Sequence, residues 1–462
     1  MLLKSKLDKI KNLLDSDNVL ATLEERYCYA KDASNSKKKI TVPDLVVFVK
    51  SIEEVQKIVK YANDHEIPVI SRGAGTNMVG ACVCEQGGIV LNFSKMNQIL
   101  EINKTNMTAK VQPGVILGNL KNEVEKLGLF YPPDPSNFKV STIGGSIAQS
   151  SGGAMSFKYG TTKDYVLSLK VVTANGEIMQ LGAETSKDAV GYHLNQLIIG
   201  SEGTLAIVVE ATLKLIPKPE TKKVVIGYFN KESDAIFAVE KIISESVFPA
   251  SIDFMDNNSM KTVEDFAKCG LKTENECVLL IDLDGLESSI EKQAEKVKKA
   301  LSEANATEVI IPNSEFEADR YWQARRSSYA AATRLAPDVV SEDVIVPRSK
   351  LIYLIKKCKE ISLGYNLKIC LVGHLGDGNL HPQFVLNLEN EDEYRNYLSA
   401  KALLYKAVKE LGGSISAEHG VGLEKKSYLE NTIDNESIKY MKLIKKAFDP
   451  KNILNPGKIF DL

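Results

Sequence analysis

The sequence lacks a long uncharged apolar run. Its most apolar long stretch, residues 194–216, still contains Glu202, Glu210 and Lys214, whereas a membrane-spanning helix needs about 20 almost uncharged residues. We therefore expect no integral membrane segment. Residues 1–14 carry charges every few positions and have no apolar core of the kind found in signal peptides. This stretch favours an amphipathic helix. A cytoplasmic location is indicated instead by the cysteines, which are odd in number and lack CxxC spacing.

The sequence also lacks a strong net charge and any regular cysteine spacing. Its 58 basic and 60 acidic residues nearly cancel, which argues against nucleic acid or an anionic membrane as a partner. The seven cysteines are odd in number and form no CxxC pair, so we expect reduced thiols and no iron–sulfur centre in this chain. For Cys82 and Cys84, small buried hydrophobes are a better interpretation than metal or covalent flavin attachment.

The length of 462 residues predicts two or three domains. The first half is mixed: a helix begins after Ser51, with Glu54 completing a capping-box signature, and apolar residues recur on one helical face. Glycine and proline clusters separate strand-like segments. These predicted strands cover residues 44–49, 67–71, 88–93, 108–112, 167–173 and 205–215.

Two prolines and a run of charge at 217–223 indicate a domain boundary. Beyond it, strands and helices alternate in longer units, which predicts an antiparallel sheet with helices on one face. We expect an α+β protein with a first domain over 1–218, completed by the tail 425–462, and a second over 219–424. The predicted strands are 224–229, 250–255 and 277–283, and the predicted helices 232–246, 258–268 and 287–303.

Residues 71–80 (SRGAGTNMVG) form a glycine-rich turn after a predicted strand. The spacing is GxGxxxxG, which is not a Rossmann fingerprint, and no Gly-Lys-Ser/Thr closes it as in a Walker A loop. Three glycines with Arg72, Thr76 and Asn77 nevertheless offer the donors of an anion-binding nest. Taken alone, this segment fits a plain loop as well as a cofactor site.

Three further segments favour a cofactor. Residues 131–136 (YPPDPS) are rigid and extended, residues 142–153 (TIGGSIAQSSGG) offer a second series of backbone donors, and residues 200–207 (GSEGTLAI) place a turn directly before a strand. A pyrophosphate and a flat ring system need such close backbone approach from several loops. Four segments in this order indicate a large ligand lying against the chain.

Together with residues 159–166 (YGTTKDYV), these segments resemble the FAD-binding domain of the vanillyl-alcohol-oxidase-type (PCMH-type) flavoproteins. More narrowly, the chain resembles the D-lactate dehydrogenase and glycolate oxidase large-subunit family, which includes D-2-hydroxyglutarate dehydrogenases. The match runs from about residue 40 to 455–458 (NPGK). The resemblance implies a PCMH-type FAD domain, a substrate (cap) domain, and FAD contacts from Arg72, Gly73, Ala74, Gly75, Thr76, Asn77, Met78, Gly80, Ala81, Pro132, Thr142, Gly144, Gly145, Gly152, Tyr159, Gly160, Glu202, Gly203, Ile207 and Asn455.

One departure from that pattern concerns flavin attachment. Members with covalently attached flavin carry a histidine just after the second glycine of the first loop. Here Gly75 is followed by Thr76 and Asn77, so we expect FAD to be held non-covalently.

Three of the five histidines lie late in the chain, in residues 374–381 (HLGDGNLH) and 416–420 (SAEHG). Positions seven apart on a helix lie about 10 Å apart, so Gly376 and Gly378 instead suggest a turn that brings His374 and His381 together. With Glu418 they would suit Zn²⁺, Fe²⁺ or Mn²⁺ with open positions. Each histidine alone is more often structural; the two motifs together favour a metal, and the resemblance implies the same set.

Three residues are expected to act on the substrate. His419, beside Glu418, has the ordinary pKa of a general base for a hydroxyl proton. The resemblance implies that Arg325 binds the substrate carboxylate, for which its planar fork is suited, and that Asn379 hydrogen-bonds the substrate. A structural role for His419 and a helix-surface role for Arg325 and Arg326 are the alternatives.

These features predict an FAD-dependent dehydrogenase that oxidises a small D-2-hydroxy acid, D-lactate or glycolate, to the 2-oxo acid. Residues 340–344 contain no lysine where 2-hydroxyglutarate-specific members place one, which favours a monocarboxylate. Without iron–sulfur or Rossmann motifs, electrons would pass to an electron-transfer flavoprotein, iron–sulfur subunits or a quinone. The alternatives are a D-2-hydroxyglutarate dehydrogenase, an oxidase, and a non-catalytic FAD electron-relay subunit.

Overall fold

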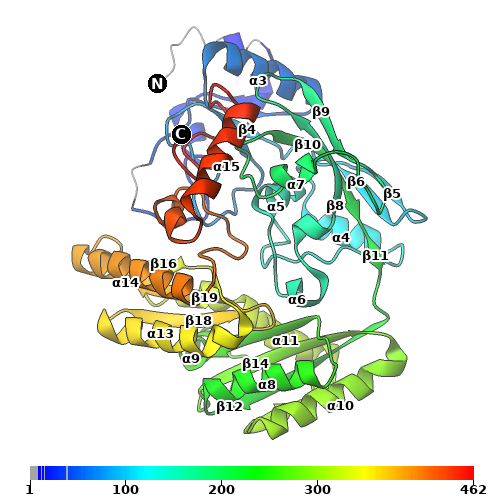
Figure 1. Ribbon diagram of the computed structural model, residues 1–462, viewed down its shortest axis with the longest axis vertical. Coiled ribbons are helices and arrows are strands. Elements are labelled where there is room, and N and C mark those ends of the chain that lie inside the picture. Colours follow the sequence, from blue (N-terminus) through cyan, green and yellow to red (C-terminus); the bar gives the residue numbers. More distant parts are fainter. Residues whose placement is uncertain (1–8, 12, 15, 38–39) are drawn as a thin grey trace.

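A computed structural model describes residues 9–11, 13–14, 16–37 and 40–462. The chain forms an upper part, built mainly from the first half of the sequence, and a lower part built around one large sheet (Figure 1). Most of the helix predicted over residues 1–14 lies outside the described residues. Among the described helices, none combines the length and apolar character that crossing a membrane requires.

The upper part contains two larger sheets. The first has the order β1-β2-β4-β3, with β1 antiparallel to β2 and the other pairs parallel. The second, β5-β6-β10-β8-β9, is antiparallel throughout. The strands of both are β1 Val19–Leu20, β2 Leu45–Phe48, β3 Val69–Arg72, β4 Ile89–Asn92, β5 Ile99–Asn103, β6 Thr108–Val111, β8 Val166–Val172, β9 Ile178–Gly182 and β10 Ile207–Lys214.

Helix α3 (Ile52–His65) packs the apolar face predicted from the sequence against the first sheet, burying Val55, Ile58, Val59 and Ala62. Its start differs from the predicted capping box in one respect. The Ser51 hydroxyl accepts from the Glu54 amide, but the Glu54 carboxylate accepts from the amide of Lys50 rather than Ser51. The remaining upper helices are short: α2 Leu23–Tyr27, α4 Leu117–Glu125, α5 Ile143–Gln149, α6 Ser156–Tyr159 and α7 Leu194–Ile198.

The lower part is one eight-stranded antiparallel sheet. Seven of its strands have the order β15-β12-β14-β13-β18-β19-β16, and the eighth, β17, pairs with β19. The chain enters it after β11 (Ile216–Pro217), which still pairs with β7 (Leu129–Phe130) of the upper part. Its strands are β12 Thr221–Phe229, β13 Ser251–Asp256, β14 Cys277–Gly285, β15 Glu308–Ile310, β16 Asp338–Ser341, β17 Val344–Ile345, β18 Lys368–His374 and β19 Asn379–Leu386.

Helices cover both faces of this sheet, so the prediction of helices on one face is wrong. One face packs against α8, α10, α13 and α14, and the other against α9, α11 and α12. Consecutive residues of β12, such as Val224 and Val225, are both buried, as expected of strands covered on both sides. The helices are α8 Glu232–Ser244, α9 Asn257–Ala267, α10 Glu287–Glu303, α11 Glu315–Arg326, α12 Ser328–Ala332, α13 Leu351–Gly364 and α14 Glu391–Glu410.

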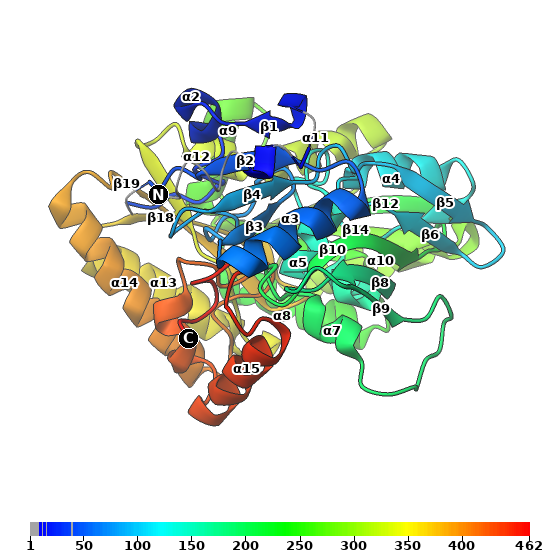
Figure 2. The same ribbon diagram turned by 90° about the horizontal axis from the view of Figure 1, so that it is seen from above.

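The C-terminal segment returns to the upper part. Helix α15 (Asn435–Phe448) lies beside the N-terminal elements in both ribbon views (Figures 1 and 2). Leu454 forms an isolated bridge with Val69 of β3, and the Asn455 amide donates to the carbonyls of Ala81 and Glu202. The chain therefore crosses between the two parts more than once, and residues 414–425 lie where they meet.

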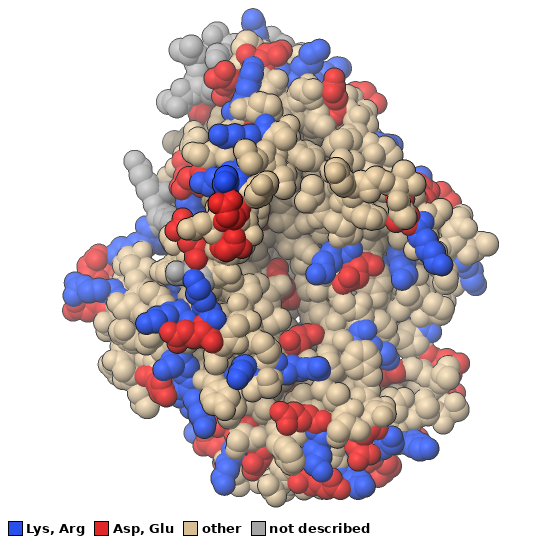
Figure 3. Space-filling view, viewed as in Figure 1, with Lys and Arg blue, Asp and Glu red and all other residues tan. Residues whose placement is uncertain are grey.

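Basic and acidic side chains are intermixed over the face drawn in Figure 3, without a large patch of one sign. This distribution agrees with the near balance of charges in the sequence.

Candidate active site

The glycine-rich loop after β3 is shaped by Asn77. Its side-chain oxygen accepts from the amides of Val79 and Ala81 at 2.9 and 3.0 Å. Its amide group donates to the backbone carbonyl of His419 at 3.2 Å. One side chain therefore both folds the loop and joins it to the segment that carries Glu418 and His419.

Three adjoining cavities run along this loop and share Gly73 and Thr142 in their walls. The 142–153 segment forms α5 at this point, with the Thr142 side chain capping its first turn by accepting from Gly145. The predicted FAD contacts that line the cavities are Arg72, Gly73, Ala74, Gly75, Thr76, Asn77, Met78, Ala81, Thr142, Gly144, Gly145, Glu202, Gly203 and Ile207.

The cavity walls fit a large polar ligand. Within the described residues, the side-chain oxygens of Ser71, Ser141, Gln149 and Ser201 are buried there without a hydrogen-bond partner. A buried polar group costs free energy unless something pairs with it, so these atoms are available to a bound cofactor. At Gly73 a Cβ atom would lie 2.1 Å from the Thr142 hydroxyl oxygen, so only glycine fits there. Because glycine has no side chain, the backbone at this position can contact a ligand in the cavity.

Several predicted FAD contacts do not line these cavities. Tyr159 donates its hydroxyl to Asp284 of β14 at 2.6 Å and so ties α6 to the lower sheet. Gly160 packs against Asp164, and Gly80 against Leu423. The Pro132 carbonyl accepts from the buried ammonium of Lys121. These residues have partners in the surrounding framework, and their direct contact with FAD stays a prediction.

Gly152 and Asn455 likewise have framework contacts, and their contact with FAD stays a prediction. A Cβ atom at Gly152 would lie 2.8 Å from a carboxylate oxygen of Glu418, so this glycine makes room for the proposed metal ligand. Asn455 joins Ala81 to Glu202 from behind the cavity. Pro135, Ser136 and Asn137 line one of these cavities; the first two belong to the predicted 131–136 segment, although none of the three was named as an FAD contact.

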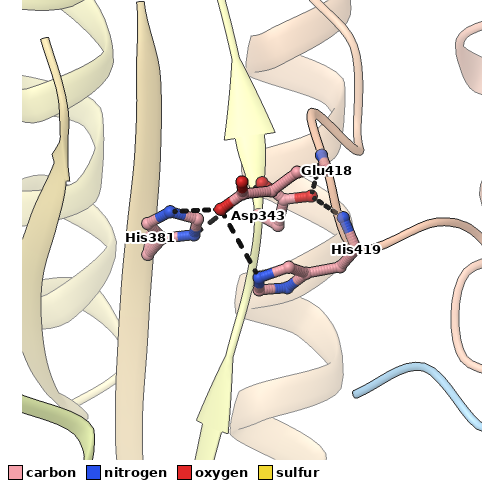
Figure 4. Close-up of side chains that lie close together, drawn as sticks. All are labelled: Asp343, His381, Glu418 and His419. Carbon is pink, nitrogen blue, oxygen red and sulfur yellow. Dashed lines mark hydrogen bonds and ion pairs between the residues drawn. The ribbon is translucent and has the colours of Figure 1, made fainter. Parts of the chain in front are cut away.

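Asp343, immediately before β17, holds the loop 416–419. One of its oxygens accepts from the Ser416 hydroxyl and from the amides of Ala417, Glu418 and His419, at 2.8 to 2.9 Å. Burial opposes its charged form, but neighbouring His419 and Lys425 and these amides lower its pKa well below the usual value. Figure 4 shows Glu418 and His419 reaching from this loop toward His381.

The predicted turn between the two histidines is present. His374 ends β18, His381 lies on β19, and the amides of Asp377 and Gly378 donate back to the His374 carbonyl. The centroids of the His374 and His381 rings lie 5.3 Å apart. Both Nε2 atoms face one oxygen of Glu418, at 3.7 Å from His374 and 3.3 Å from His381.

These distances suit a divalent cation. Ligand atoms about 2.1 Å from one tetrahedral ion are separated by roughly 3.4 Å. Burial alone would lower the pKa of His374, but Asp253 and Glu418 raise it well above its ordinary value. The pKa of Glu418 is lowered by both histidines despite its burial. The cluster thus attracts positive charge, which a metal ion would supply in place of the proton.

Among the described residues, the group whose donor atoms all lie within 4.8 Å of one another is Asp343, His381, Glu418 and His419, and it does not include His374. In this group the oxygens of Asp343 are already occupied, because one accepts from the loop and the other from Asn379 at 2.9 Å. We therefore favour His374 in place of Asp343.

Asn379 does not face a substrate cavity. Its side-chain amide donates to Asp343 and to the carbonyl of Val344, which uses both hydrogens. Asn379 therefore positions Asp343, and its hydrogen bond to the substrate stays a prediction.

Arg325, in the last turn of α11, lines a separate cavity of about 360 Å³. Its Nε atom lies 2.8 Å from Asp253. Gln383 lines the same cavity, is almost fully buried, and has a side-chain oxygen without a partner among the described residues. Gln383 and Asp253 were both missed from the sequence, because their strands carry other polar residues and the local pattern does not distinguish these two.

His419 lies between this cavity and the cavities along the glycine-rich loop. It lines both, as do Glu418, Thr76 and Met78. Its ring stacks on His381 with centroids 5.2 Å apart, and its Nδ1 atom is buried without a partner. Burial lowers the pKa of His419, which favours the neutral form that can accept a proton.

Comparison with known proteins agrees with this arrangement. Residues 43–182 match a family described as an FAD binding domain, and residues 218–459, just over half of the chain, match the C-terminal domain of FAD linked oxidases. The chain belongs to the FAD-linked oxidase family. The resemblance inferred from the sequence motifs is thus confirmed, and the protein is an FAD-dependent oxidoreductase.

The relatives in this family carry several related names. The chain is 44% identical to glycolate oxidase subunit GlcD of Bacillus subtilis, over 94% of this chain and 92% of that protein. It is 36% identical to D-lactate dehydrogenase of Anaerostipes hadrus, covering 90% and 89%. It is 32% identical to D-2-hydroxyglutarate dehydrogenase of Stutzerimonas stutzeri, covering 98% of each.

The fold is shared with more distant proteins. The structure of p-cresol methylhydroxylase with substrate bound superposes with a TM-score of 0.84 at 18% identity, covering 100% of this chain and 98% of that one. The predicted PCMH-type α+β fold is confirmed by this similarity.

The cavity at Gly73 leads to a first prediction. In Gly73→Ala the added methyl group would displace Thr142 and disturb the start of α5. We expect FAD affinity to fall about five- to a hundredfold, since overpacking costs roughly 1–3 kcal/mol, as measured by the flavin-to-protein absorbance ratio after dialysis. The matched control is Gly364→Ala, because that site is open and its glycine has no positive φ. Equal flavin content in both variants would contradict the assignment.

The role of Asp343 leads to a second prediction. Both oxygens of Asp343 accept hydrogen bonds. In Asp343→Asn one of them is replaced by an NH₂ group, which cannot accept from the donors on that side. We expect a loss of roughly 2–5 kcal/mol in the free energy of unfolding and faster hydrogen exchange at the amides of 417–419, measured by denaturant titration and mass spectrometry. Unchanged exchange at these amides would show that the loop is held by other contacts.

Proposed function

We propose that this protein oxidises a small D-2-hydroxy acid, D-lactate or glycolate, to the corresponding 2-oxo acid. FAD is held non-covalently along the glycine-rich loop, and a divalent cation (Zn²⁺, Fe²⁺ or Mn²⁺) is held by His374, His381 and Glu418. The observation that carries the proposal is that Glu418 and His419 line both the flavin-side cavities and the cavity with Arg325. A substrate there would lie between an arginine and the flavin.

The residues of the cavity have complementary roles. Arg325 binds the substrate carboxylate through the part of its guanidinium group that Asp253 leaves free. His419, kept neutral by burial, accepts the hydroxyl proton. Bound FAD supplies the acceptor for the hydride, and a bound cation supplies a Lewis acid that acidifies the hydroxyl. Thr76 and Met78 form the boundary between the two cavities.

A D-2-hydroxyglutarate dehydrogenase is the second candidate. Arg326 lines the same cavity as Arg325 and offers a second cation for a distal carboxylate, and one relative carries this name. The absence of lysine at 340–344 still favours a monocarboxylate. The rates of anaerobic flavin bleaching by D-lactate, glycolate and D-2-hydroxyglutarate decide between the two.

Electrons must leave the flavin after each turnover. One relative is named as a subunit of glycolate oxidase, which supports a role within an assembly. The chain's cysteines have no cluster-binding spacing, so we infer that the acceptor is a separate electron-transfer flavoprotein or iron–sulfur subunits. The cytoplasmic location stays a prediction.

The proposed base leads to a third prediction. His419→Ala is expected to retain FAD and to reduce the rate of anaerobic flavin reduction by D-lactate or glycolate about 10²- to 10⁴-fold, measured by stopped-flow absorbance. The matched control is His193→Ala, since His193 is exposed and lines neither cavity. If wild-type flavin is reduced by none of the tested 2-hydroxy acids, the proposed function is wrong; if the His419 variant reduces at the wild-type rate, only the base is wrong.

The proposed cation leads to a fourth prediction. Purified wild-type protein is expected to contain about one divalent metal ion per chain, and His381→Ala and Glu418→Gln are expected to lose it while keeping FAD, because three ligands hold the ion. Elemental analysis by mass spectrometry and the flavin absorbance measure the two cofactors. Full activity of wild-type protein after complete chelation would contradict this part of the proposal.

A further inference from the structure

Asp253 lies between the proposed cation site and the proposed substrate arginine. It is on β13, directly opposite His374 in the register with β18, and it is 1% exposed. One carboxylate oxygen lies 2.8 Å from Nδ1 of His374, and the other lies 2.8 Å from Nε of Arg325. One side chain therefore uses each of its oxygens for a different functional residue.

Each contact acts on the functional group of the residue it touches, the imidazole of His374 or the guanidinium of Arg325. A carboxylate at Nδ1 keeps the hydrogen on that atom and directs the lone pair of Nε2 toward Glu418, as is usual for metal-binding histidines. At Arg325 the carboxylate forms an ion pair with Nε, without the geometry of a hydrogen bond, and leaves the terminal nitrogens for a ligand. The carboxylate therefore faces an imidazole N–H on one side and a guanidinium on the other, and it is almost fully buried between them.

We propose that Asp253 is a positioning residue that couples the cation site to the substrate-binding arginine, so that its loss weakens cation binding and 2-hydroxy-acid binding together. The inference rests on the proposed function, because it takes His374 as a ligand and Arg325 as the carboxylate anchor. It adds that Asp253 positions residues of both the cation site and the substrate-binding site. Removing the charge of Asp253 should therefore weaken both sites, although His374 and Arg325 are unchanged.

The test compares Asp253→Asn with Asp256→Asn in the FAD-containing protein. Asp256 is a buried carboxylate on the same strand, but it caps α9 by accepting from Ser259, a role that asparagine also performs. Two quantities are measured without turnover: retention of Zn²⁺ or Mn²⁺ against graded chelator, and the affinity for pyruvate with metal at saturation, followed by the change in flavin absorbance.

For Asp253→Asn we expect cation affinity to fall 10- to 100-fold, the usual effect of removing a carboxylate behind a metal-bound histidine. Pyruvate affinity should fall at least about tenfold even when metal is restored, because Arg325 loses the carboxylate with which it forms an ion pair. Asp256→Asn is expected to resemble wild type in both measurements. Arg325→Ala should lower pyruvate affinity and leave cation affinity unchanged.

A loss of only one of the two affinities in Asp253→Asn would overturn the coupling, as would values equal to those of Asp256→Asn. If Asp253→Asn does not fold, the double variant Asp253→Asn/Arg325→Gln removes both charges of the pair and avoids a buried unpaired arginine. The double variant is expected to fold, and its cation affinity should still fall 10- to 100-fold; wild-type cation affinity would overturn the proposal. A wild-type protein without any bound cation would instead contradict the proposed function.

Discussion

The active-site region depends on the carboxylate of Asp343. One oxygen gathers the hydroxyl and three amides of residues 416–419, and the other receives Asn379 from β19. An ionised carboxylate accepting several N–H groups is among the stronger hydrogen-bonded arrangements in proteins. It holds the loop that carries Glu418 and His419 beside the sheet that carries His374 and His381.

The two parts of the chain build the site jointly. The lower sheet contributes Asp253, His374 and His381 from three adjacent strands, so their spacing follows from antiparallel register. The upper part contributes the glycine-rich loop, which Asn77 joins to the carbonyl of His419. The flavin-side cavities and the Arg325 cavity meet at residues held from both sides. Chemistry at this point therefore requires both parts to be folded together.

The sequence predicts those features that depend on local pattern. Helical periodicity and a capping residue predicted α3, the local sequence pattern predicted most of β12, and the glycines between His374 and His381 predicted the turn that joins them. Contacts between distant residues could not be predicted in this way. Asn379 pairs with Asp343 rather than facing the cavity, and Asp253 shows its role only when β13 lies beside β18. The helices on the second face of the lower sheet, α9, α11 and α12, were missed for the same reason. Which face a helix covers is decided by contacts between residues that are distant in the sequence.

The central claim is that His374, His381 and Glu418 hold a cation beside the flavin. Anomalous diffraction from crystals of the FAD-containing protein, grown with metal present, tests it most directly. The account predicts one strong peak about 2.0–2.2 Å from Nε2 of both histidines and from a Glu418 oxygen. The absence of a peak in crystals of active protein, or a peak bound by Asp343 with His374 outside coordination distance, would contradict it.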